Sequence, residues 1–174
     1  MLQLFSILVI NEPGVLIRIA SLFSRRNFNI HSLAVGTTHN PLISRITIIL
    51  FADENRADQI ISQIKKSPVV LAVERLDPHN SVTRGIALFK IHATDSNRDS
   101  ILNIAYAFHA NVLDLRPDSI ILEFTGSIDK ISAAQNALQH FGIIELIQSG
   151  QIALNRDEPL SFNQNPPFVH KNLL

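Results

Sequence analysis

The order of segments along the chain constrains its fold most, because the same order occurs twice. In the first half, a strand-like apolar run is followed by a helix, two β-rich runs, a second helix and a last strand. Helical spacing of apolar residues marks the helices, and β-branched and aromatic residues mark the strands. The expected ranges are 4–10, 15–25, 28–37, 44–51, a helix from Asp53 that ends before Pro68, and 69–76. This order predicts a βαββαβ unit.

The order restarts after a turn-rich break at residues 77–81. The second set of expected elements covers residues 86–93, 99–108, 111–115, 120–125, 128–140 and 143–154. The predicted class is α+β: two tandem ferredoxin-like units, each with an antiparallel sheet and two helices on one face. We expect domains at residues 1–77 and 85–157, a linker at 78–84 and a loosely ordered tail at 158–174. Units of about 75 residues have marginal cores, so burial against another copy or subunit is expected.

Composition and charge exclude several classes of function. The 174 residues carry a formal net charge of +0, and no stripe of Lys or Arg suggests a nucleic-acid surface. A tandem RNA-recognition module shares the βαββαβ order but needs exposed aromatic platforms, for which Phe5 and Phe51 are poor substitutes. The chain has no cysteine, its seven His are scattered, and no apolar run is long enough to cross a membrane. With a first strand that begins near Leu2, we expect no signal or transit peptide, and a location in a bacterial cytoplasm or, if organelle-encoded, in the plastid stroma.

The turn after the first strand is the best candidate for a binding site. It contains Asn11, Pro13, Gly14 and Val15, directly before the first helix. Gly14 allows a ligand close to the backbone, and the amides of Gly14 and Val15, which open the next helix, are expected to be free to bind an anion such as an amino-acid carboxylate. The Asn11 side chain could hold either the ammonium or the carboxylate. The alternative is that these residues only shape a strand-to-helix turn.

The second strand of the first unit, residues 28–37, is expected at the edge of a sheet of order 4-1-3-2. This run contains no Lys, Asp, Glu or Pro, the residues that commonly protect an edge from pairing. We therefore expect it to pair with its symmetry mate in a two-fold dimer. Asn29, near the start of the strand, would then face the turn at residues 11–15 of the other chain.

These residues resemble the small, regulatory subunit of acetolactate synthase, whose first domain is an ACT domain. The similarity runs from residue 2 to about 157. It is carried by five segments: 11–16 (NEPGVL), 23–33 (FSRRNFNIHSL), 43–48 (ISRITI), 124–131 (FTGSIDKI) and 141–145 (FGIIE). Asn27 replaces the usual Gly of the family, and Asn is the residue that best tolerates positive φ in its place. Gly85 and Gln148 replace a common acidic residue and a common Arg.

The resemblance implies a protein that performs no catalysis itself. It implies that valine, or a related branched-chain amino acid, binds between paired ACT domains and inhibits a catalytic large subunit that the small subunit also activates. The effector would contact Asn11, Gly14 and Val15 of one chain, in the turn that Pro13 shapes, and Asn29 and Ile30 of its mate. Thiamine diphosphate, Mg²⁺ and FAD would belong to the large subunit, with no cofactor on this chain. A free-standing ACT-type sensor of another enzyme is the alternative.

Overall fold

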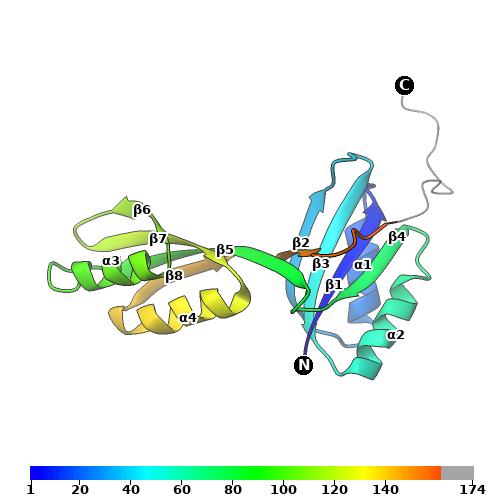
Figure 1. The fold of residues 1–174 in the computed structure, drawn as a ribbon, viewed down its shortest axis with the longest axis horizontal. Coiled ribbons are helices and arrows are strands. Elements are labelled where there is room, and N and C mark those ends of the chain that lie inside the picture. The colour runs from blue at the N-terminus through cyan, green and yellow to red at the C-terminus, as the bar shows by residue number, and fades with distance from the viewer. Residues whose placement is uncertain (162–174) are drawn as a thin grey trace. The chain divides into compact units, whose positions relative to one another are not determined.

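The computed structural model describes residues 1–161, which form two compact units (Figure 1). The first unit contains residues 1–82 and the described residues from Ala153 onward, and the second contains residues 83–152. The elements of the first βαββαβ set are β1 (Leu2–Ile10), α1 (Val15–Ser24), β2 (Ile30–Thr37), β3 (Ile43–Phe51), α2 (Glu54–Ile64) and β4 (Val70–Leu76).

The first sheet is antiparallel, with the order β2-β3-β1-β4. This confirms the expected order and the position of β2 at the edge. Alternate residues of the central strands β1 and β3 face the two helices, which cover one side of the sheet (Figure 1). The core between these layers contains Phe5, Ile7, Ile19, Phe23, Ile48, Leu50, Ile60 and Ile64, each at most 3% exposed.

Local signals position the two helices. Asp53 caps α2, because its side chain accepts a 2.8 Å hydrogen bond from the Arg56 amide. Asn27 follows α1 with a φ of 56°, which confirms that this Asn keeps a turn for which glycine is the usual residue. The chain can therefore leave α1 and enter β2 without a glycine.

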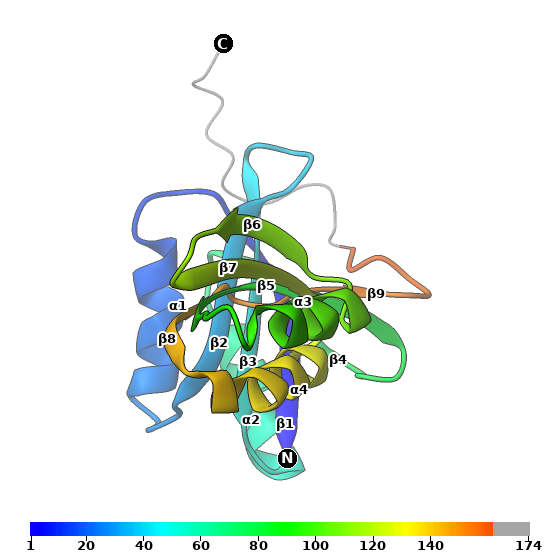
Figure 2. The same ribbon diagram turned by 90° about the vertical axis from the view of Figure 1, so that its left-hand side faces the viewer.

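The second unit repeats this architecture. Its elements are β5 (Ser81–His92), α3 (Arg98–Ala107), β6 (Asn111–Leu115), β7 (Ser119–Gly126), α4 (Ile128–Leu138), the 3₁₀ turn η1 (Gln139–Phe141) and β8 (Ile143–Gln148). The antiparallel order is β6-β7-β5-β8, and α3 and α4 lie together on one side of the strands (Figure 2). Phe89 and Phe124 are fully buried in the core, with ring centroids 4.9 Å apart in an edge-to-face arrangement. Both units are thus α+β with the predicted topology.

The ends of the second unit differ from the expected elements. Strand β5 begins at Ser81, inside the segment expected to be a linker, and the expected final strand is divided into β8 and β9 (Ile152–Asn155). Strand β9 pairs with β5, so the chain returns along the strand by which it left the first unit. The division at residues 77, 84 and 157 stays a prediction. Of the expected tail, only residues 158–161 are described.

Gly85 has a packing role in the second unit. A Cβ atom at this position would overlap the side-chain amide of Gln151, which is 4% exposed. A side chain at residue 85 would therefore require the Gln151 amide to move.

Candidate functional site

The turn between β1 and α1 leaves backbone donors open at the start of a helix. Gly14 precedes α1 with a φ of +82°, and no side chain caps this helix. The Val15 amide is directed to the Glu12 carbonyl at 3.4 Å, whereas within residues 1–161 the amides of Gly14, Leu16 and Ile17 have no hydrogen-bond acceptor. The open donors are therefore those of residues 14, 16 and 17, and the helix dipole adds positive potential at the same point.

Asn11 is held at this turn by two bonds to the loop between β2 and β3. Its backbone amide donates to the Leu42 carbonyl at 2.8 Å, and its side-chain Nδ2 donates to the Pro41 carbonyl, also at 2.8 Å. Asn11 itself is exposed. Within the described chain, its side-chain oxygen accepts no hydrogen bond and is open to a ligand.

Asn29 and Ile30 lie at the other end of the sheet from this turn. Ile10, at the end of β1, is paired with Ile43, whereas Ile30 is paired with Leu50 at the far end of β3. The eight residues of β2 span roughly 23 Å at about 3.3 Å per residue. One copy of the chain therefore does not bring Asn29 to Asn11.

Their surroundings also differ. Asn29 is exposed, whereas Ile30 is half-buried and packs against the core of the first unit. Pro13 is exposed within the turn, and Val15 is buried at the first position of α1. Of the residues named from the sequence, one copy thus brings together Asn11, Pro13, Gly14 and Val15.

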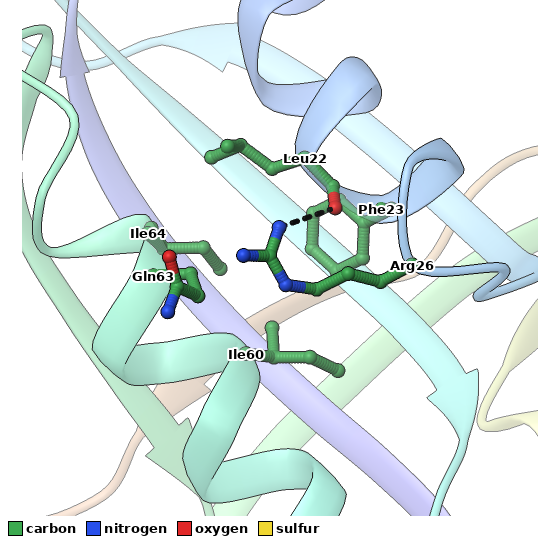
Figure 3. A pocket seen from close by; sticks show the side chains of 6 residues that line it. All are labelled: Leu22, Phe23, Arg26, Ile60, Gln63 and Ile64. Carbon is green, nitrogen blue, oxygen red and sulfur yellow. Dashed lines mark hydrogen bonds between the residues drawn. The ribbon is translucent and has the colours of Figure 1, made fainter.

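A hollow between α1 and α2 lies apart from the turn. It is lined by Leu22, Phe23, Arg26, Ile60, Gln63 and Ile64 (Figure 3). The Arg26 guanidinium reaches over it and donates to the Leu22 carbonyl at 3.5 Å, which satisfies a carbonyl at the end of α1 (Figure 3). Because α1 is about 15 Å long, the hollow and the open amides lie at opposite ends of the helix.

A partly buried carboxyl group, that of Glu74, lies on the face of the first sheet opposite the helices. Burial raises the pKa of Glu74, although the charge of Arg45 and a hydrogen bond from Asn155 of the returning chain oppose the shift. Arg45 also donates to the Ser6 hydroxyl at 3.3 Å. One oxygen of the Glu74 carboxyl, Oε1, is buried and has no hydrogen-bond partner among residues 1–161. This group stabilises the fold better when it is neutral.

The described residues contain no group of three or more His, Cys, Asp or Glu side chains placed to hold a metal ion. In the same part of the chain, no helix is long and apolar enough to cross a membrane.

Comparison with known proteins identifies the family. Residues 5–72 match the model of the ACT domain of acetohydroxyacid synthase small subunits, and residues 84–157 match that of the small subunit of acetolactate synthase. The acetolactate synthase small subunit of Mycobacterium bovis is 42% identical over 151 residues, which cover 87% of this chain and 90% of that protein. The Aquifex aeolicus small subunit is 36% identical over 164 residues, covering 94% and 85% of the two chains.

A solved structure agrees with these relatives. The crystal structure of the acetolactate synthase small subunit from Thermotoga maritima has a TM-score of 0.82 and 35% sequence identity, and the match covers 90% of this chain and 98% of that one. Its similarity extends over both units described above. The chain belongs to the family of acetolactate synthase small, regulatory subunits, with an ACT domain in its first half.

Proposed function

We propose that this protein senses a branched-chain amino acid, most simply valine, and transmits its presence to the catalytic large subunit of acetolactate synthase. The small subunit would activate the large subunit, and the bound amino acid would reduce that activity. It would do so without catalysing a reaction, because thiamine diphosphate, Mg²⁺ and FAD would be held by the large subunit. Membership of the family supports this reading, and the geometry of the turn before α1 supports the location of the site.

The separation of Asn29 from Asn11 is the observation that carries the proposal for a shared site. Strand β2 is a sheet edge, and its Val35 side chain is 48% exposed. If the β2 strands of two copies pair antiparallel about a two-fold axis, the start of one strand lies beside the end of the other. Asn29 of the second copy then approaches Asn11 of the first, so two copies together would complete a site that one copy leaves open.

The residues at this junction suit a zwitterion with an apolar side chain. The open amides of Gly14, Leu16 and Ile17 can bind a carboxylate, and an asparagine oxygen can accept from an ammonium group. The side chain of Leu16, which is 42% exposed, offers an apolar surface next to these amides. Selectivity among valine, leucine and isoleucine would be modest, because one methylene group contributes only about 1–3 kcal/mol.

Reconstitution with the acetolactate synthase large subunit tests the proposed function. We expect the small subunit to raise the rate of acetolactate formation and valine to lower it. The effector coupling should be of the typical size, about 1–3 kcal/mol, and the large subunit should alter the affinity for valine to the same extent. Neither activation nor inhibition by any of the three branched-chain amino acids would contradict the proposal.

The shared site has a separate test. Asn29→Ala should abolish the rise in melting temperature that valine produces, without lowering the melting temperature of the unliganded protein. Asn111→Ala, which changes an exposed asparagine of the second unit, is the matched control and should keep the full valine response. A full response in the Asn29→Ala protein would remove Asn29 from the site.

A further inference from the structure

The loop between β2 and β3 is hydrogen-bonded to Asn11 of the candidate effector site. Two consecutive carbonyls of this loop, those of Pro41 and Leu42, accept the side-chain and backbone donors of Asn11 at 2.8 Å each. The loop is thirty residues further along the chain than the turn it holds. It therefore determines how Asn11 is presented, although it belongs to a different hairpin.

The bond to Pro41 decides which end of the Asn11 amide faces a ligand. A backbone carbonyl can only accept, so the atom that faces Pro41 must be the nitrogen Nδ2 and not the oxygen. The side-chain oxygen then points away from the loop and accepts no bond from residues 1–161. An acceptor held in this way suits an ammonium group and repels a carboxylate, which the residue type alone leaves undecided.

Several hydrogen bonds within the loop hold its backbone in this conformation. The Asn40 side-chain oxygen accepts from the Leu42 amide at 3.0 Å, beside the two carbonyls that hold Asn11. The Thr38 hydroxyl donates to the Asn40 carbonyl at 3.0 Å and accepts from the Asn40 amide at 3.1 Å. The backbone closes the hairpin by a 2.9 Å bond from the Thr38 amide to the Ile43 carbonyl.

We infer that Thr38 and Asn40 are positioning residues for effector recognition: they order the loop whose Pro41 carbonyl turns the Asn11 oxygen toward the ammonium group of a bound amino acid. This inference rests on the proposed function, since it concerns the same site. Neither residue need touch the effector. Their influence on affinity passes through Asn11.

The test is a set of binding titrations by calorimetry with the full chain, using whichever of valine, leucine and isoleucine binds the wild type most tightly. Asn40→Ala removes the acceptor of the Leu42 amide, and we expect about fivefold weaker binding, the size typical of one lost hydrogen bond. Asn40→Asp keeps an acceptor oxygen at this position and should restore most of the affinity. Thr38→Val, which has nearly the same shape without the hydroxyl, provides an independent change should Asn40→Ala fail to fold.

A double-mutant cycle with Asn11→Ala separates positioning from a general structural effect. If the loop acts through Asn11, Asn40→Ala should have little further effect on affinity in the Asn11→Ala background. The same fivefold loss in both backgrounds would overturn the inference, as would wild-type affinity in both Asn40→Ala and Thr38→Val. Absence of binding of all three amino acids by the wild type would instead overturn the proposed function, and this inference with it.

Discussion

Replacing Gly14 by alanine measures the conformational cost of the turn before α1, because the space around this residue is open. Gly14 has a φ of +82°, and a Cβ atom built on it meets no atom within 4 Å. The cost is therefore that of a left-handed backbone for an L-residue, about 1–2 kcal/mol, with no steric clash to add. For a chain of this length, that cost lowers the melting temperature by roughly 2–8 °C.

Asparagine at the same position is the matched comparison. It has a larger side chain than alanine, yet it tolerates a left-handed backbone better, as Asn27 does in this protein with a φ of 56°. We therefore expect Gly14→Asn to destabilise less than Gly14→Ala. A steric explanation predicts the opposite order, because the larger residue would then cost more.

Denaturant unfolding followed by far-UV circular dichroism measures both costs. The chain has no tryptophan and one tyrosine, so the backbone signal is the better probe. All variants should be compared at one protein concentration, because the proposed dimer would stabilise the folded state by mass action. A Gly14→Ala protein as stable as the wild type would refute the assigned backbone conformation, and a Gly14→Asn protein less stable than Gly14→Ala would refute the conformational argument.

Three further predictions concern other parts of the chain. Burial raises the pKa of Glu74, so the folded protein is most stable below the ordinary carboxyl pKa and loses stability as the pH rises through the raised pKa. Glu74→Gln, which cannot ionise, should therefore raise the melting temperature at pH 7 and change it little near pH 4. Asp53→Ala and Ser127→Ala each remove a helix cap and should cost about 1 kcal/mol, measured by denaturant unfolding, with smaller losses for the asparagine substitutions at the same positions. Val35→Lys places a charge on the exposed edge strand and should shift the proposed dimer toward monomer in analytical ultracentrifugation. Tyr106→Lys, at an 82% exposed position on α3 of the second unit, is the comparison for added charge alone.

Most of the fold could be predicted because its signals are local. Helical and alternating periodicity record which face of each element is buried, and the short connections leave few topologies for a βαββαβ order. The turn at Asn27 and the start of α2 at Asp53 could be predicted for the same reason, since a positive φ and a helix N-cap each depend on the type of a single residue. The early start of β5 at Ser81 and the separate strand β9 were missed, because these segments pair with each other across about seventy residues.

The candidate site could be predicted only as a set of residues. Glycine before a helix indicates open amides, but which amides are open depends on the Glu12 carbonyl, to which the Val15 amide is directed. The side-chain amide of Asn11 could have presented either its oxygen or its nitrogen Nδ2 to a ligand. Neither question has an answer in the residue types, because both depend on the exact course of the backbone.

The sequence by itself determined the two α+β units, the edge position of β2 and the family, because hydrophobic periodicity and the order of the motifs can be read directly from the residues. Only the tertiary structure decided that Pro41 orients Asn11 and that Asn29 lies at the far end of the sheet from it. The physical reason is that hydrogen bonds between distant segments depend on strand register, which no local pattern encodes. Because Asn29 and Asn11 are far apart in one copy, the turn before α1 is only half of the proposed site, and the other half would lie on a second copy.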